Sequence, residues 1–189
     1  MLILIEFMES GIGRGWRVRQ LADDEVIEGF SCGDSDLDDY ILNESKLYQA
    51  ELIAANYLLE DEQRRLIAFF TLVNDRVCIN DFDTYTAFNR FRNKRFVQSK
   101  RFRGYPALKV GRLGVTKNFI RSGIGSILLD FIKTYFIKNR RTGCRFLTVD
   151  AYQDAVPFYD KNGFVKLNEE SNSNTCLMYY DLLDFKGRL

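Results

Sequence analysis

The chain has 189 residues, of which 46% are hydrophobic and 14% aromatic, so it can bury a sizeable core and suits one domain. Its formal net charge of +1 provides no overall attraction to nucleic acid or to a membrane surface. The absence of histidine excludes Ser-His-Asp and Cys-His catalysis and histidine-ligated zinc. A general base must then be a carboxylate, a water or a backbone group. A general acid must be a tyrosine, a cysteine, a lysine or a carboxyl group with a raised pKa.

The cysteines and the N-terminus indicate the compartment. No C-x-x-C pair occurs among the four widely spaced cysteines, which favours buried, reduced thiols in a cytoplasmic protein without a metal site. These cysteines are Cys32, Cys78, Cys144 and Cys176. Residues 1–8 are apolar but interrupted by Glu6, have no basic leader and are too short to span a membrane. They are either a first strand or part of an extension, which we place at residues 1–15 of a single domain spanning 1–189.

The first elements in chain order are a strand and a helix. Residues 16–21 predict the strand. Residues 34–48 carry apolar side chains at helical spacing, and Asp34 or Ser35 is suited to cap the helix N-terminus. The acidic residues at the start of this segment complement the positive end of the helix dipole.

Two paired strands are expected next. Residues 52–59 and 66–73 are apolar and are separated by the polar turn 61–63. Residues 75–103 are less regular and become strongly basic toward their end. From residue 108 onward the pattern predicts strand, helix, strand, helix, strand, strand, which is typical of a layered α/β fold.

Residues 108–132 predict a strand, a glycine turn and an amphipathic helix. Gly123 and Gly125 lie at the turn, where backbone amides and the helix dipole can form a phosphate site. The alternative is that these glycines only punctuate the chain. A Walker loop is excluded because no Lys-Ser or Lys-Thr follows. A dinucleotide fingerprint is excluded because Leu128 holds the third glycine position.

Two stretches here match one family pattern, Gly111-Arg112-Leu113-Gly114-Val115 and Arg121-Ser122-Gly123-Ile124-Gly125-Ser126-Ile127-Leu128-Leu129. They resemble the acetyl-CoA site of the GNAT superfamily of N-acetyltransferases, whose loop runs Gln/Arg-x-x-Gly-x-Gly/Ala. Gly123 and Gly125 fill the two small positions of that loop. Ile120 stands where the family has Gln or Arg, and Arg121 partly replaces the missing charge.

A second region supports the resemblance independently. Residues 146–151 predict a strand, and residues 154–164 resemble the closing helix of the family with its Phe-Tyr-x-Lys-x-Gly-Phe pattern. Gly163 is suited to end this helix in a left-handed conformation. Residues 176–180 resemble the last strand of the family. The resemblance covers residues 109–182 closely and residues 16–74 more loosely.

The resemblance implies an α/β fold with a GNAT-like mixed, mostly antiparallel central sheet that is splayed between its fourth and fifth strands and flanked by helices. We place the splay at Arg112–Val115 and Thr148–Asp150. The implied co-substrate is acetyl-CoA, and no metal is implied. The residues predicted to bind acetyl-CoA are Leu113, Gly114, Val115, Arg121, Ser122, Gly123, Ile124, Gly125 and Ser126.

The implied reaction is direct transfer of an acetyl group to a primary amine. Tyr159 takes the place of the family tyrosine and is the candidate general acid, because a phenol is protonated at neutral pH and able to protonate a thiolate. A tyrosine that only fills the core is the alternative. Asp150 and Tyr152 are candidates to bind the substrate or order a water, although Asp150 also fits a solvated strand end. Gly114 indicates a bulge or a close backbone approach, and nearby amides are suited to an oxyanion.

The acceptor amine is less constrained. Residues 90–103 combine basic side chains with phenylalanines, which fits either nucleic-acid binding or a solvated amphipathic segment. Residues 30–41 resemble the Phe-x-Cys-Gly-x-x-x-Leu-x-x-Phe/Tyr segment of a GNAT branch that includes toxins acting on aminoacyl-tRNA. The basic surface of these toxins would correspond here to Arg92, Lys94, Arg95 and Arg101.

Three functions therefore remain open. The first is an acetyltransferase for a small-molecule or peptide amine, and the second is a toxin that acetylates aminoacyl-tRNA. The third is an acyl-CoA-binding module without catalysis, because the cofactor loop departs from the family at Ile120. The resemblance to this family also implies a homodimer.

Overall fold

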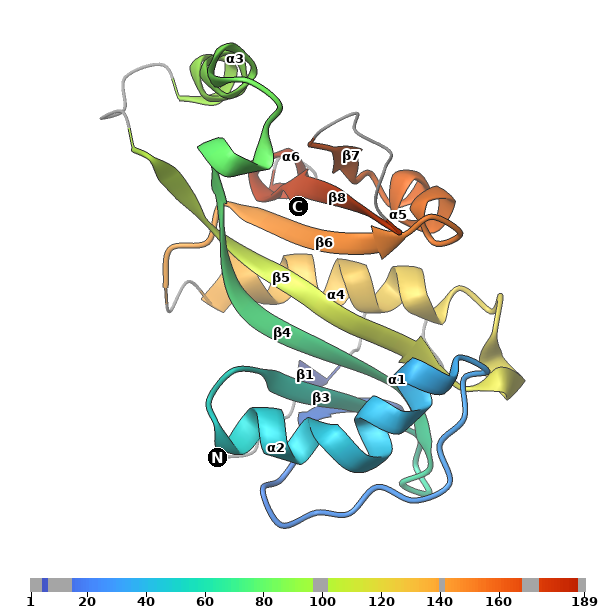
Figure 1. Cartoon of the computed structure of the whole chain (residues 1–189). Coiled ribbons are helices and arrows are strands. Elements are labelled where there is room, and N and C mark those ends of the chain that lie inside the picture. Colours follow the sequence, from blue (N-terminus) through green and yellow to red (C-terminus); the bar gives the residue numbers. More distant parts are fainter. Residues whose placement is uncertain (1–4, 7–14, 97–101, 140–141, 168–173, 187–189) are drawn as a thin grey trace. The chain divides into compact units, whose positions relative to one another are not determined.

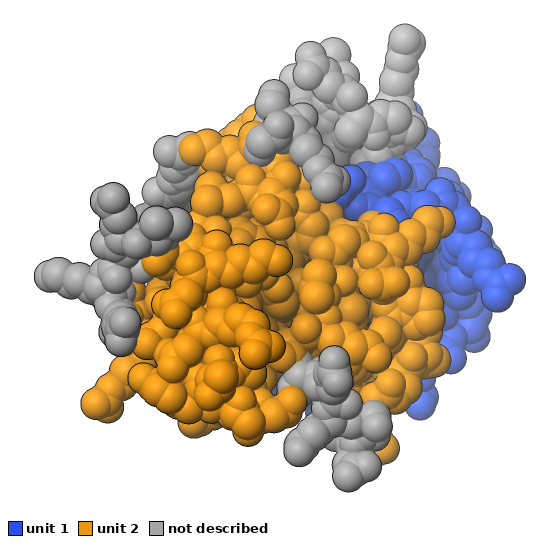
Figure 2. All heavy atoms as spheres, turned by 90° about the horizontal axis from the view of Figure 1, so that it is seen from above, with its two compact units in different colours: residues 1–73, 110–132 blue, residues 74–109, 133–189 orange. Residues whose placement is uncertain are grey.

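The computed structural model of the chain describes residues 5–6, 15–96, 102–139, 142–167 and 174–186. The chain divides into two compact units, one made of residues 1–73 and 110–132 and the other of residues 74–109 and 133–189 (Figure 2). Three elements run from one unit into the other, namely β4 (Leu66–Cys78), β5 (Gly104–Val115) and α4 (Ile124–Asn139).

The first unit contains strands in the order β1-β2-β3-β4-β5. The pairs β1–β2, β2–β3 and β3–β4 are antiparallel. Helices α1 and α2 follow each other in the chain, and α2 packs beside β3 (Figure 1). The elements confined to this unit are β1 (Ile5–Glu6), β2 (Arg17–Gln20), α1 (Ser35–Asp39), the π-helical turn η1 (Tyr40–Glu44), α2 (Ser45–Ala50), β3 (Ala55–Glu60) and the 3₁₀ turn η3 (Lys117–Phe119).

The helix predicted at residues 34–48 is interrupted by the π-helical turn. Its predicted N-cap is confirmed, since the Asp34 side chain accepts hydrogen bonds from the amides of Asp36 and Leu37. Tyr40 and Gln49 are buried in addition to the expected apolar positions.

A buried polar network explains why this turn is packed inward. Asn56 on β3 is fully buried, and its Oδ1 accepts hydrogen bonds from the Tyr40 hydroxyl at 2.9 Å and the Thr71 hydroxyl at 2.8 Å. Its Nδ2 donates to the carbonyl of Ser45 at 2.7 Å. Because every one of these groups is paired, the polar residues cost little to bury, and they fix the helical segment on the sheet.

The strand boundaries differ from the prediction at two places. The strand expected at residues 52–59 begins only at Ala55, because Leu52 has a φ of 57° and is 92% exposed in the preceding turn. The strand expected to end at Val73 continues to Cys78. The turn at residues 61–63 is confirmed, and the amide of Asp61 donates to the carbonyl of Arg65 at 3.1 Å.

Gly114 on β5 confirms the expected close backbone approach. A Cβ atom at this position would lie 2.5 Å from Cε1 of Phe69, which is fully buried. We expect Gly114→Ala to lower the free energy of unfolding by about 1–3 kcal/mol, because the Phe69 ring would have to move within a packed core. Urea unfolding measures this loss. The control is Gly111→Ala on the same strand, whose Cβ would meet Val73 Cγ2 at an ordinary 3.5 Å, and an equal loss in both variants would refute the steric argument.

The second unit contains strands in the order β4-β5-β6-β8-β7. Strand β5 is parallel to β6, whereas β6–β8 and β7–β8 are antiparallel. The elements confined to this unit are the 3₁₀ turn η2 (Ile79–Asp81), α3 (Tyr85–Arg95), β6 (Phe146–Tyr152), α5 (Val156–Lys161), β7 (Val165–Lys166), β8 (Thr175–Asp181) and α6 (Leu182–Lys186). The fold is therefore the expected mixed, mostly antiparallel sheet with flanking helices.

The parallel pairing of β5 with β6 is short. Among the described residues it runs from Ala107↔Phe146 to Lys109↔Thr148, although β5 continues to Val115 and β6 to Tyr152. Beyond Thr148, β6 keeps its antiparallel partner β8. This early end of the parallel pairing agrees with a sheet that is splayed between these two strands. On β5 the pairing ends at Lys109, slightly before the predicted splay at Arg112–Val115.

Residues 75–103 are more regular than expected, because they contain the end of β4, η2 and α3, which Figure 1 shows in green. Helix α3 contributes Phe88 and Phe91 to a core that also contains Tyr105, Phe146 and Tyr179. The sequence pattern did not predict this helix, because basic residues are interleaved with these phenylalanines.

Candidate active site

The predicted cofactor loop lies entirely in the first unit and is anchored by backbone hydrogen bonds. The amide of Thr116 donates to the carbonyl of Ile67 at 2.9 Å, and the amide of Lys117 donates to that of Ser31 at 3.0 Å. Arg121 has a φ of 63° and Gly123 a φ of 88°, so two left-handed residues reverse the chain before α4 begins at Ile124. A left-handed non-glycine residue costs about 1–2 kcal/mol, and such strain often occurs at functional sites.

The loop presents an open surface at the N-terminus of α4. Arg121, Ser122 and Gly123 are exposed, and a Cβ atom added to Gly123 would meet no atom within 4 Å. The amide of Ile127 donates to the carbonyl of Gly123 at 3.1 Å. The amides of Ile124, Gly125 and Ser126 come before this first intrahelical hydrogen bond. Because the first amides of a helix have no acceptor within the helix, they are available to bind an anion.

The departure from the family loop is visible in the geometry. The Ile120 side chain is 51% exposed and its backbone is extended. Arg121, the next residue in the chain, is exposed. Leu113, Gly114 and Val115 form the end of β5 in the same unit as the loop, so all predicted cofactor residues belong to one compact unit.

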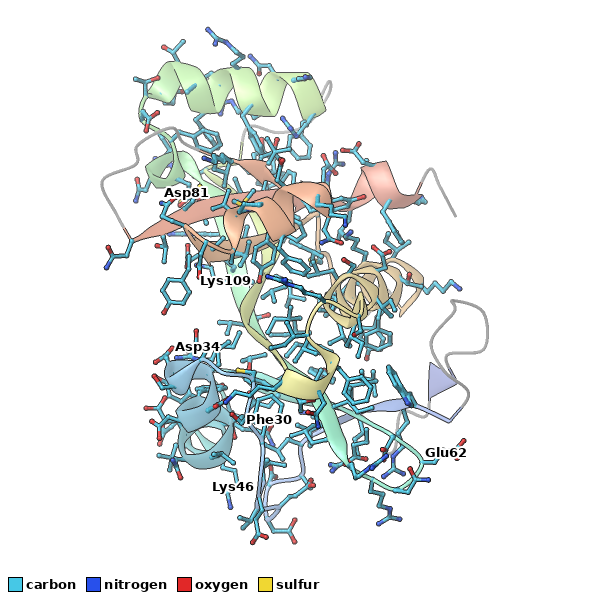
Figure 3. The ribbon with its side chains drawn as sticks, turned by 90° about the vertical axis from the view of Figure 1, so that its right-hand side faces the viewer. Phe30, Asp34, Lys46, Glu62, Asp81 and Lys109 are labelled. Atoms are coloured by element: carbon cyan, nitrogen blue, oxygen red, sulfur yellow. The ribbon has the colours of Figure 1, made fainter. Side chains whose placement is uncertain are left out.

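The segment at residues 30–41 has a clear structural role in the first unit (Figure 3). Phe30 is buried and packs edge-on against Phe69, with ring centroids 5.2 Å apart. The Asp38 carboxylate accepts hydrogen bonds from the Ser31 hydroxyl at 2.9 Å and the Cys32 amide at 2.7 Å. Burial acts to raise the pKa of Asp38, but these hydrogen bonds outweigh it and the pKa is lowered. The motif therefore fixes the loop whose Ser31 carbonyl accepts from the cofactor segment.

Tyr159 lies on α5 in the second unit and is only 7% exposed. Its ring packs edge-on against Phe158 at 5.0 Å and Phe164 at 5.4 Å between centroids. Burial raises the pKa of Tyr159 to about 12, so the hydroxyl stays protonated well above neutral pH. No hydrogen bond from the described residues engages this hydroxyl, which leaves it able to donate to a ligand.

Asp150 is held by an ion pair that the sequence did not reveal. Lys109 Nζ lies 2.7 Å from Asp150 Oδ2 and 3.8 Å from Asp75 Oδ2, and the Thr148 hydroxyl donates to Asp75 at 2.5 Å. Burial acts to lower the pKa of Lys109 (labelled with Asp81 in Figure 3), but the hydrogen bond to Asp150 and the charges of Asp150, Asp75 and Asp81 raise this pKa above its ordinary value. Lys109 is therefore a fixed cation.

The other predicted substrate residue, Tyr152, ends β6 and is 49% exposed. It belongs to the second unit together with Asp150 and Tyr159, whereas the cofactor loop belongs to the first. No local signal could have predicted the pairing of Lys109 with Asp75 and Asp150, because the partners come from three different strands.

The predicted basic surface is divided by the fold. Arg92 is 6% exposed and lies over the Phe88 ring, and Arg95 pairs with Asp181 at 3.4 Å and stacks on Phe91. Arg92 is therefore buried and Arg95 is half-buried in contacts within the unit, and the surface patch predicted from them is wrong in that respect. Arg90 and Lys94 are exposed on α3, and Arg101 lies outside the described residues.

Within the described part of the chain, no group of three or more histidine, cysteine or acidic residues is arranged to hold a metal ion. In the same part, none of the helices combines the length and the apolar character that crossing a membrane requires.

Comparison with known proteins establishes the family. Residues 60–179 match the family model described as Acetyltransferase (GNAT) domain, and the chain belongs to this family. It is thus an acetyl-CoA-dependent N-acetyltransferase, with acetyl-CoA as co-substrate. The comparison with curated protein sequences finds no match.

Solved structures with the same fold cover nearly the whole chain. A mutant of KacT is 22% identical with a TM-score of 0.74, covering 93% of this chain and 100% of its own. AtaTR bound with acetyl-CoA is 18% identical with a TM-score of 0.73, covering 92% and 98%. AtaT complexed with acetyl-methionyl-tRNAfMet is 17% identical with a TM-score of 0.69, again covering 92% and 98%. These likenesses extend the shared fold to the region before residue 60.

Proposed function

We propose that this acetyltransferase transfers the acetyl group of acetyl-CoA directly to the amino group of an aminoacyl-tRNA, with Tyr159 as general acid. The observation that carries the proposal is the likeness in fold, over 92% of the chain, to AtaT complexed with acetyl-methionyl-tRNAfMet. The segment at residues 30–41, which resembles the branch of tRNA-acetylating toxins, supports it because its Asp38-centred loop holds the cofactor segment.

In the proposed reaction, the neutral amine attacks the thioester carbonyl and the C–S bond breaks. The Tyr159 hydroxyl gives its proton to the departing thiolate, and the new amide nitrogen loses a proton to water or a carboxylate. The amides at the end of β5, near Leu113 and Val115, would stabilise the oxyanion, and those around Gly123 would hold the pyrophosphate. Asp150, fixed by Lys109, is the candidate contact for the acceptor, together with Tyr152.

The protonation state of Tyr159 is compatible with its role. Its phenol stays protonated at neutral pH, and its hydroxyl has no partner among the described residues to compete with the substrate. A second candidate is acetylation of a small-molecule or peptide amine. It is favoured by the net charge of +1 and by the buried and half-buried positions of Arg92 and Arg95, which leave less basic surface for tRNA.

The test is acetyl transfer from radiolabelled acetyl-CoA. We expect label to be incorporated into a mixture of aminoacyl-tRNAs but not into the same tRNA after deacylation, which removes the acceptor amine. Labelling only of free amines or peptides would support the second candidate. Binding of acetyl-CoA in isothermal titration without transfer to any acceptor would support the non-catalytic module.

A cellular experiment complements the assay. If the protein acts as a toxin, its expression arrests growth and Tyr159→Phe relieves the arrest. The proposal also treats residues 1–189 as one acetyltransferase domain that acts in the cytoplasm, and a homodimer remains a proposal that analytical ultracentrifugation would test.

A further inference from the structure

Lys133 on α4 is an unusual residue because its charged side chain is buried. It is 2% exposed, and it lies in the second unit with Tyr159. Burying an ammonium group is costly unless polar or charged partners compensate for the lost water. The surroundings of Lys133 therefore identify what the lysine holds in place.

Aromatic rings and the carbonyl group of Asn162 are among the described groups that contact this ammonium. Its Nζ atom lies 4.3 Å from the centroid of Tyr180, 5.4 Å from that of Phe185 and 6.0 Å from that of Phe164. Rings at these distances attract a cation through their negative faces. The Nζ atom also donates to the backbone carbonyl of Asn162 at 3.1 Å.

Asn162 connects Lys133 to the end of the helix that carries Tyr159. It is the C-cap of α5, and its amide donates to the carbonyls of Tyr159 at 3.0 Å and Phe158 at 3.2 Å. Its Nδ2 atom donates to the Phe158 carbonyl at 2.7 Å. The Tyr159 carbonyl also accepts from the amide of Phe164 at 3.0 Å. The hydrogen bond from Lys133 thus reaches Asn162, the C-cap residue whose own hydrogen bonds hold the last turn of α5, which contains Tyr159.

Helix α5 needs such support. It is only six residues long, and its N-cap, Ala155, offers no side-chain hydrogen bond. A helix of this length is not stable by itself, so its position depends on tertiary contacts. After its last turn, Gly163 has a φ of 82° and lies so close to Tyr180 that an added Cβ would be 3.0 Å from Cε2. The end of α5 therefore rests on a ring of the cage that holds Lys133.

We propose that Lys133 is a positioning residue for the transfer reaction, which acts by fixing the C-terminal end of α5 and with it the Tyr159 side chain. The proposal rests on the proposed role of Tyr159 as general acid. Lys133 does not touch the reacting atoms. It restrains the helix end through Asn162, and it restrains Phe164, whose ring packs against Tyr159.

The first test is Lys133→Met in the full chain, with radiolabelled acetyl-CoA and the aminoacyl-tRNA mixture as substrates. Methionine is of similar length and packs well against aromatic rings, so the fold should survive the loss of charge. We expect kcat to fall by about tenfold or more, because small displacements of catalytic groups are costly, while KM for acetyl-CoA stays unchanged. The control is Lys138→Met, an exposed lysine of the same helix, which should leave both constants unchanged.

A double-mutant cycle with Tyr159→Phe separates positioning from general destabilisation. If Lys133 acts through the Tyr159 hydroxyl, the double variant is no slower than Tyr159→Phe alone. Losses that multiply would overturn the proposal for Lys133 and leave Tyr159 intact. A Tyr159→Phe variant with full activity would instead overturn the proposed acid.

A second variant covers the case in which Lys133→Met does not fold. Asn162→Ala removes the bond from Nδ2 to the Phe158 carbonyl at a half-buried position and keeps the lysine in its cage. We expect the same pattern of lower kcat and unchanged KM. Wild-type kcat in this variant would contradict the idea that the helix end positions Tyr159.

Discussion

Tyr159→Phe is expected to lower kcat by a factor of about 10² to 10⁴, the range that a lost general acid accounts for. Acetyl-CoA binding should persist, because the predicted cofactor amides lie in the other compact unit. The substitution removes only a hydroxyl that no described residue engages, so the packing against Phe158 and Phe164 remains. Steady-state transfer assays and isothermal titration with acetyl-CoA measure the two quantities.

The matched control is Tyr85→Phe, since Tyr85 is a 59% exposed tyrosine in the same unit and should have no effect on kcat. The pH profile gives a further check. The protonated phenol is the active form, and burial raises its pKa from the ordinary 10 to about 12. The ratio of wild-type to Tyr159→Phe rates should therefore stay constant from pH 7 to about pH 10 and shrink only above it. A ratio that already shrinks between pH 7 and 9 would assign the acid to another group.

Gly123→Ala is expected to weaken acetyl-CoA binding by about 10- to 100-fold, which corresponds to about 1.4–2.7 kcal/mol. The added Cβ meets no protein atom within 4 Å, so it would project into the open space that the proposal assigns to the pyrophosphate. Isothermal titration measures the dissociation constant of acetyl-CoA.

Gly29→Ala is a suitable control for this variant. Gly29 is in the same unit, has a φ of 72° and also has no atom within 4 Å of an added Cβ. Both variants should lose a similar amount of stability, about 1 kcal/mol, because alanine is strained in the left-handed region. Only Gly123→Ala should lose affinity. Equal affinity in the two variants would show that the turn at Gly123 does not contact the cofactor.

Local signals predicted the parts of the fold that depend on neighbours in sequence. The strand, glycine turn and helix at residues 108–132 could be predicted because apolar periodicity and glycine placement are read within one segment. The same holds for the N-cap at Asp34 and the helix end at Gly163, both of which the structure confirms. These features also carried the family resemblance.

Hydrophobic periodicity did not predict the buried positions at which the side chains are polar or basic. Tyr40 and Gln49 are buried because Asn56 and the backbone around it pair with them, and no hydrophobic period marks such positions. Helix α3 was missed because Arg92 and Arg95 gave it a basic, irregular pattern, although both side chains stack on phenylalanines inside the unit.

The sequence by itself determined the family, the co-substrate and the candidate acid, because short motifs with local geometry carry this information. Only the tertiary structure decided which charged residues are internal. Lys109 forms ion pairs with Asp75 and Asp150, and the three residues lie on three different strands. Lys133 lies among aromatic rings that come from segments distant in the sequence. A buried charge is tolerated only when its partners surround it, and those partners are brought together by the fold and not by their spacing in the chain.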